Sequence, residues 1–285
     1  MNSCYLFFLF LFVCKSQSQT APIFSPEVEQ GRIDSFELDE ASGLAASRLH
    51  PGILYSHNDH GDRPRLFAIN ASTAEVVATL EISPAYHNDW EDIAVGPCAK
   101  GDQRTCIYIL DDGNYHGVDK RTVYRVVEPD TMVDQTIAPD STYKYNWTET
   151  AADTIMVDNN ADIYVISNTL GGRGMIAKLP AQAWGQKNPV YIDSGSYFAM
   201  YSSHHDPAGG DISPDGTEVL VKTRDYIYYW KPADGDIVAA LTHPGIKVPY
   251  YKERLGEAVC WSADGSAYYT LGEGLHQKLY MYERA

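Results

Sequence analysis

Short apolar and polar segments alternate along this chain in a unit that occurs five times. Each unit begins with an acidic residue and continues through a strand of small and apolar residues, a turn, a β-branched or aromatic strand, a polar loop and further aromatic-rich strands. The acidic starts are Glu40, Glu91, Asp153, Asp211 and Glu257, at spacings of 51, 62, 58 and 46 residues. Such runs, bounded by Gly, Pro, Asn and Asp, predict β-strands, and helical periodicity is scarce. The pattern therefore indicates an all-β protein.

The spacing of the units predicts the architecture. Repeats of about 40 to 50 residues with four strands each are typical of β-propeller blades. The last unit ends after three strands, and the segment 32–38, ahead of the first unit, has the pattern of one more strand. We expect this segment to complete the last blade and close the ring, which leaves no open sheet edge. The sequence thus predicts one domain over residues 19–285, a propeller of five four-stranded blades closed by an N-terminal strand.

Two other architectures stay open at this point. A sixth, degenerate blade would fit within residues 128–150 or 180–210. An antiparallel sandwich fits the same composition, but it gives no reason for an acid at the same point of every unit. The five-bladed propeller is therefore the preferred interpretation.

The N-terminal residues predict export. The apolar run 5–13 is too short to cross a bilayer as a helix, and the small residues Ser16 and Ser18 suit signal-peptide cleavage. We interpret residues 1–18 as a signal peptide and expect a secreted, extracellular protein without a membrane span. Asn70 in N-A-S and Asn146 in N-W-T are acceptors for N-glycosylation on such a route.

Cysteine usage fits the same compartment. Cys98 and Cys106 flank a polar loop, and in an oxidising compartment we expect them to form a disulfide that closes a hairpin. Cys260 is left over in an apolar stretch, where a buried, unreactive thiol is expected.

The charge of the chain restricts its partners. It has 38 acidic and 22 basic residues, a formal net charge of −16. Nucleic acid is excluded as a partner because no basic patch is present to neutralise phosphates. Cations, cationic surfaces or mineral are more natural companions, and we expect a monomer that carries a small-molecule or glycan ligand on its acidic face.

The acids at the strand entries form the predicted metal site. In a propeller the inner strands begin on the same face as the loops between the second and third strands, so carboxylates from both should meet around the axis. The predicted ligands are Glu40, Glu91, Asp92, Asp153, Asp211 and Glu257. Oxygen-rich donors without sulfur favour Ca²⁺ over Mg²⁺, and zinc is a minor hypothesis because no H-x-H or H-E-x-x-H spacing occurs. The structural alternative is that these acids accept hydrogen bonds from backbone amides of the adjoining blade.

The loops on this face supply further candidates. Predicted substrate-binding residues are Asn58, Asp59, Asp111, Asp112, Asn114 and Arg224, and His57 or His205 is the predicted base that activates water. Two functions follow from these residues. One is Ca²⁺-dependent hydrolysis of a phosphoester, nucleotide, lactone or ester. The other is non-catalytic binding of calcium, glycan or mineral in an extracellular matrix.

Several sequence strings resemble a family of secreted β-propeller proteins, common in bacteria, that has no settled function. The matching strings are S-G-L-A-A-S at 42–47, P-G-I-L-Y-S-H-N-D at 51–59, D-W-E-D-I-A-V-G-P at 89–97, D-I-S-P-D-G at 211–216 and G-E-A-V at 256–259. Asp153 stands where the family typically has glutamate, and L-D-D-G-N at 110–114 replaces its usual G-D-I-G-D-N loop. More distantly, the architecture is similar to calcium-activated nucleotidases and to lactone- or phosphoester-cleaving propellers, a likeness that implies calcium in the central channel but does not fix function.

Overall fold

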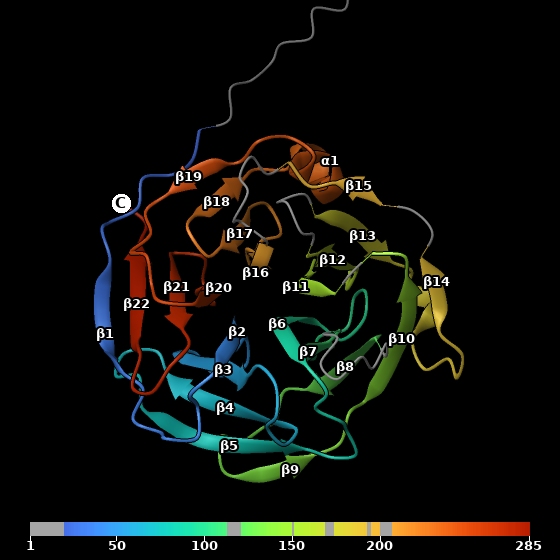
Figure 1. Cartoon of the computed structure of the whole chain (residues 1–285), viewed down its shortest axis with the longest axis horizontal. Helices are drawn as coiled ribbons and strands as arrows, with labels where there is room; N and C mark the ends of the chain where they lie inside the picture. The colour runs from blue at the N-terminus through green and yellow to red at the C-terminus, as the bar shows by residue number, and fades with distance from the viewer. Residues whose placement is uncertain (1–19, 113–120, 150, 169–173, 193–194, 200–206) are drawn as a thin grey trace, which may run out of the picture.

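Five β-sheets stand around a common axis and form a ring (Figure 1). This computed structural model describes residues 20–112, 121–149, 151–168, 174–192, 195–199 and 207–285. The predicted signal peptide 1–18 and the candidates Asn114 and His205 lie outside the described residues. The ring of four-stranded blades confirms the predicted five-bladed propeller, so the sandwich alternative is wrong.

Each blade runs outward from an inner strand at the axis. Blade 1 contains β2 (Ala41–Ala46), β3 (Ile53–Asn58), β4 (Arg65–Asn70) and β5 (Val76–Ile82). Blade 2 contains β6 (Trp90–Pro97), β7 (Thr105–Asp111), β8 (Arg121–Val127) and β10 (Ser141–Trp147). Blade 3 contains β11 (Ala152–Val157), β12 (Ile163–Ser167), β13 (Met175–Leu179) and β15 (Ser196–Tyr197). Blade 4 contains β16 (Pro207–Ile212), β17 (Val219–Thr223), β18 (Ile227–Trp230) and β19 (Ile246–Val248).

Blade 5 combines the two ends of the chain. It contains β20 (Gly256–Trp261), β21 (Ala267–Gly272), β22 (Lys278–Glu283) and the outer strand β1 (Val28–Arg32), which pairs antiparallel with β22. The closing strand was predicted at 32–38, and that position is wrong, because only Arg32 belongs to β1. Ile33 and Leu38 are instead buried in a core cluster between blades 1 and 5. The apolar pattern of 32–38 thus marks a packed connection, whereas β1 is held mainly by its backbone.

The segments that could have hidden a sixth blade add strands to existing blades. β9 (Gln135–Ile137) pairs parallel with β5 of blade 1, and β14 (Val190–Ile192) pairs parallel with β10 of blade 2. The six-bladed alternative is therefore wrong.

Helix is scarce in this ring. The short helices are η2 (Ala181–Ala183), η3 (Ala233–Gly235) and α1 (Ile237–Leu241). Within the described ranges, no helix has the length and hydropathy needed to cross a membrane.

Apolar side chains fill the spaces between neighbouring blades. One core cluster, for example, joins Tyr55 and Leu66 of blade 1 to Ile93 and Ile109 of blade 2, all with at most 1% of their surface exposed. Removal of this apolar surface from water is the main favourable term in holding successive blades together.

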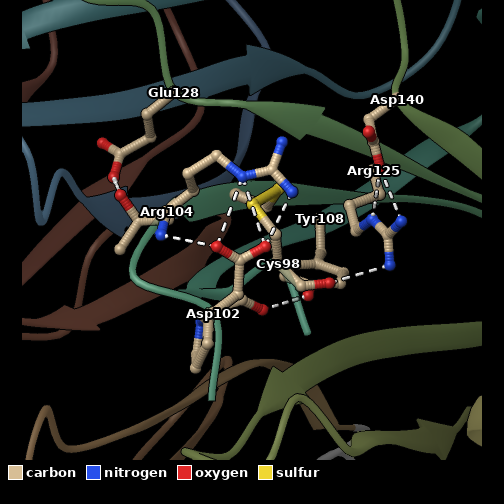
Figure 2. Close-up of a disulfide and its surroundings, with 10 residues drawn as sticks. Cys98, Asp102, Arg104, Tyr108, Arg125, Glu128 and Asp140 are labelled. Carbon is tan, nitrogen blue, oxygen red and sulfur yellow. Dashed lines mark hydrogen bonds and ion pairs between the residues drawn. A yellow bond between two sulfur atoms is a disulfide. The ribbon is translucent and has the colours of Figure 1, made fainter. Parts of the chain in front are cut away.

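The predicted disulfide is present between Cys98 and Cys106, at the turn between β6 and β7 (Figure 2). Arg125 of β8 donates a hydrogen bond of 2.8 Å to the Cys98 carbonyl and pairs with Asp140. Cys260 is a free thiol buried between blades 1 and 5. Burial raises the pKa of this thiol well above its usual value, which suppresses the reactive thiolate.

Phe24 offers a test of ring closure, because it anchors the residues ahead of β1. It pairs with Arg284 in an isolated bridge, and its ring packs on Trp261 and Tyr268 of blade 5. We expect Phe24→Ala to lower the free energy of unfolding by about 3 kcal/mol, the usual cost of removing a buried aromatic ring. The matched control is Ile23→Ala, since Ile23 is 76% exposed. Urea unfolding should separate the two variants, and coincident transitions would contradict this role.

Candidate functional site

Every inner strand has a β-bulge near its start, at one mouth of the central channel. A bulge leaves a residue without a ladder partner and redirects its side chain. By the strand registers, the bulge leaves Glu91, Asp153, Ala208 and Glu257 without a ladder partner, and in blade 1 it involves Ser42 and Gly43. Glu91, Asp153 and Glu257 therefore occupy equivalent positions, as the repeat predicted.

Two of the aligned acids are not equivalent to these three. Asp211 pairs with Leu220, three positions beyond the bulged Ala208. It lies toward the opposite mouth, in a small hollow that Arg48 and Pro214 also line. Glu40 precedes β2 and lies at the rim, where its carboxylate is 4.0 Å from His60 Nδ1. The comparison of the five repeat units wrongly placed Asp211 at the start of its strand. An acid near a turn can be assigned to either end of a short strand when only the sequence is known.

A second ring of polar residues follows the second strand of each blade. These residues are Asp59, Asp112, Asn168, Arg224 and Glu273, each directly after β3, β7, β12, β17 or β21. The two rings are in contact. The Asn168 side chain donates to Asp153 at 2.7 Å, and Arg224 donates to Glu257 at 3.2 Å. Ser42 Oγ donates to the Glu91 carbonyl at 2.6 Å and lies 3.3 Å from the other oxygen of Glu257.

Among the described residues of this mouth, negative charge exceeds positive charge. Burial, followed by repulsion from Asp153, Asp59, Asp89 and Glu257, raises the pKa of Glu91 well above its usual value. The same two causes raise the pKa of Asp59 to about 6 and that of Glu273 to about 7. Arg224 opposes the shift at Glu273, and His60 opposes the shift at Asp59. Protons or a bound cation would relieve the remaining repulsion.

Asp59, His60 and Asp89 form the tightest group of possible metal ligands in the part of the chain described, with donor atoms within 4.8 Å of one another. Two loops bring them together. His60 and Asp89 pair in an isolated bridge, and the Asp59 carbonyl accepts from Trp90 N at 3.1 Å. A carboxylate oxygen of Asp111 accepts from Asp89 N at 3.0 Å, so Asp111 fixes the position of the loop.

Asp92 has a structural role. Its side chain is fully buried, and its two oxygens accept from Ile93 N, Ile155 N and Gly210 N at 2.9, 3.0 and 3.2 Å. This carboxylate joins blade 2 to blades 3 and 4 across the axis. Burial raises its pKa. Asp211 likewise accepts from Trp261 N of blade 5 at 2.9 Å. The backbone-amide alternative therefore describes Asp92 and Asp211.

The predicted substrate-binding residues fall into two groups. Asp59 and Arg224 reach the mouth. Asn58 is hydrogen-bonded to the loop ahead of β2. Its amide oxygen accepts from Asp39 N and Glu40 N, both at 3.1 Å. Asp112 is buried and bonded to Tyr145, Ala152 and Arg121. Asn58, Asp111 and Asp112 are thus used to hold loops and blades in place.

His57, one of the two predicted bases, is completely buried. Its Nδ1 lies 2.8 Å from the Asn58 carbonyl, and Nε2 has no hydrogen-bond partner among the described residues. A Cβ on Gly43 would lie 2.6 Å from Nε2, so glycine is needed beside the ring. Burial lowers the pKa of His57 to about 3. In this conformation the imidazole is neutral and cannot contact a substrate.

Three residues of the mouth, His60, Asp89 and Glu273, are not among the ligands predicted from the sequence. Their position in the sequence could have indicated them. Each lies within two residues of an acid that the sequence predicted for the site, or of the end of the second strand of a blade. The bulges that aim Glu91, Asp153 and Glu257 leave no comparable mark in the sequence, since a bulge is a property of strand pairing.

Comparison with known proteins gives the class of fold. No family model matches the chain, and no curated protein matches it. The PQQ-bound aldose sugar dehydrogenase from Streptomyces coelicolor superposes with a TM-score of 0.51 at 12% identity, over 92% of this chain and 99% of that one. A chain of the mitotic checkpoint complex gives 0.39 at 13% identity, over 85% and 63%. The WD40 repeats of RRP9 give 0.41 at 12% identity, over 86% and 67%. At such identities the first likeness shows the β-propeller fold alone.

The charge of Glu273 offers a test of repulsion at the mouth. A carboxylate whose pKa is raised by folding stabilises the protein below its unfolded pKa, and this contribution is lost as the pH rises through about 7. Without divalent cations, we therefore expect Glu273→Gln to match the original protein near pH 4.5. At pH 8 it should be more stable by about 1 kcal/mol, a value reduced for solvent screening.

Urea unfolding in a chelating buffer across this pH range measures the effect. Glu75→Gln is the matched control, because Glu75 is exposed on the turn between β4 and β5. Identical pH profiles for the Glu273 variant and the original protein would rule out repulsion at this position.

Proposed function

We propose that this protein is a secreted propeller that binds Ca²⁺ at the acidic mouth of its channel. The observation that carries the proposal is the convergence of Asp59, Asp89 and Glu257 on Glu91, whose ionisation is opposed by burial and then by repulsion from neighbouring acids. A divalent cation between these carboxylates would replace repulsion with attraction. Asp153 and Glu273 lie on the same rings and would complete the negative surroundings.

The kinds of donor atom favour calcium over other ions. Ca²⁺ takes about six to eight oxygen ligands in adaptable geometry, whereas Mg²⁺ requires a tight octahedron. Carboxylates from several blades and loops supply many oxygens without imposing an octahedron. The single histidine of the group, His60, is hydrogen-bonded to Asp59 at 3.1 Å, and zinc normally takes more nitrogen or sulfur donors.

The disulfide supports export. Such bonds persist in oxidising compartments and are rare in the cytosol. Asn146 is exposed and Asn70 is partly exposed, so the surface positions of both predicted glycosylation acceptors also favour passage through the secretory route.

Binding without catalysis is better supported than hydrolysis. A general base must come within hydrogen-bond reach of the water or substrate proton that it removes. Burial removes His57 from consideration in this conformation, and His205 lies outside the described residues. A calcium-binding module of the extracellular space is therefore our proposal. The second candidate, a Ca²⁺-dependent hydrolase, would need a base other than His57.

Calorimetric titration tests the cation site. We expect one saturable Ca²⁺ site and weaker Mg²⁺ binding. Glu91→Gln should weaken Ca²⁺ binding by at least about tenfold, because it removes a charged ligand without changing the shape of the side chain. Glu75→Gln removes the same charge from a distant exposed turn and should leave affinity unchanged. Absence of Ca²⁺ binding, or equal affinity in both variants, would refute the proposal.

Turnover assays distinguish the two functions. In the presence of Ca²⁺, the binding module should hydrolyse no member of a panel of nucleotides, phosphoesters, lactones and aryl esters. Turnover that chelation abolishes, and that Glu91→Gln reduces, would replace the binding module with the hydrolase. A glycan array with and without Ca²⁺ would then identify any carbohydrate partner of the acidic face.

A further inference from the structure

A cavity of about 720 Å³ lies on the outer part of the ring, between the connection 83–86 and strands β8 and β10 of blade 2. The connection leads from blade 1 to blade 2, and Figure 1 shows β8 and β10 side by side. The volume is within the range of small-molecule sites, about 300 to 1,000 Å³. Its lining includes Tyr86, Arg121, Tyr124, Lys144, Lys187 and Pro189.

Hydrogen bonds and strand pairing hold the cavity open. Tyr86 N donates to Tyr124 Oη at 3.1 Å, and the Tyr86 carbonyl accepts from Trp90 Nε1 at 2.9 Å. The connection is thus fixed at both its amide and its carbonyl. On the opposite wall, Lys144 of β10 pairs with Thr122 of β8, so alternate residues of both strands face the cavity. These contacts preorganise the cavity, which reduces the cost of binding.

The lining has a charge opposite to that of the whole protein. Among the described residues that line it there are three basic residues and no carboxylate, although the chain has 38 acidic and 22 basic residues. Asp112 balances Arg121 at 3.2 Å. Lys144 and Lys187 are exposed, and no described acid lies within ion-pair distance of either one. Two positive charges that no described acid compensates therefore line this cavity, where they would attract an anion.

The remaining surface of the cavity suits a flat ring. Tyr86 is 82% exposed, which is unusual for a side chain that normally loses much of its surface on folding. Pro84, Pro189 and Tyr124 add carbon surface around it. Aromatic side chains stack on flat rings, and lysines bind phosphate, sulfonate or carboxylate groups as point charges.

We propose that this cavity is a binding site for a small aromatic anion, separate from the acidic mouth. Lys144 and Lys187 would contact the anionic group, and Tyr86 would contact the ring. The site takes ligands of the opposite charge from those of the channel, so the two proposals stand or fall independently.

Two naphthalene compounds test the charge and ring requirements. In calorimetry, 1-naphthyl phosphate should bind at one site, and 1-naphthol, which has the same ring without the anion, should bind at least about tenfold more weakly. Inorganic phosphate alone should also bind at least about tenfold more weakly, because it cannot contact Tyr86. All titrations contain a chelator, so that no calcium at the mouth can bridge to phosphate. Every protein carries Thr148→Ala, which removes the Asn146 glycosylation sequence beside the cavity.

Variants locate the binding. The double variant Lys144→Gln and Lys187→Gln should weaken naphthyl phosphate binding at least about tenfold, and Tyr86→Ala at least about threefold. The charge-matched control is Lys100→Gln with Lys252→Gln, on distant exposed turns and loops, which should bind as the parent does. Unchanged urea midpoints would show that the variants fold. Equal affinities for naphthyl phosphate and naphthol, for naphthyl phosphate and phosphate, or for the two double variants would overturn the proposal.

Discussion

The inner strands approach one another so closely that two positions, Gly43 and Gly209, leave no room for a side chain. A Cβ on Gly43 would lie 2.7 Å from Ile93 N, and one on Gly209 would lie 2.7 Å from the Glu257 carbonyl. Backbone amides packed this tightly need acceptors, because a buried amide without one costs free energy. Asp92 supplies acceptors to blades 2, 3 and 4 with a single carboxylate. The geometry of the channel mouth depends on this central packing.

The acids of the channel thus have two uses, which the shape of the channel separates. The buried acids Asp92 and Asp211 accept hydrogen bonds from backbone amides of neighbouring blades. Acids redirected by the bulges at the mouth, such as Glu91, keep oxygens available for other partners. An acid near the start of an inner strand therefore has one of two roles. It either joins neighbouring blades through their backbone amides or forms part of the acidic surface at the mouth. The structural acid lies one position beyond the bulged residue in blade 2, at Asp92, and three positions beyond it in blade 4, at Asp211.

These two roles of the acids also explain which features of the fold and of the site could be predicted from the sequence. Blade number, the disulfide and the closing role of the N-terminal segment followed from spacing and composition. The position of β1 did not, because V-E-Q-G-R has little strand propensity and pairs through its backbone with β22. The strands β9 and β14 could not be predicted, because a three-residue strand forms only by pairing with a partner that is distant in the sequence. Equivalence at the site failed for Asp211, since bulges and burial arise only when strands pair.

The parallel additions β9 and β14 have a consequence for the rim of the ring. They cover β5 and β10, which are seven residues long, so that the outer edge of each sheet is a strand of five residues or fewer. Long unpaired edges are templates on which other chains add strands, and natural proteins avoid them by shortening or covering the edge. The perimeter of this protein offers an approaching β-strand few consecutive amides and carbonyls. Such a perimeter suits the secreted protein that we propose, since no chaperone would separate copies joined edge to edge outside the cell.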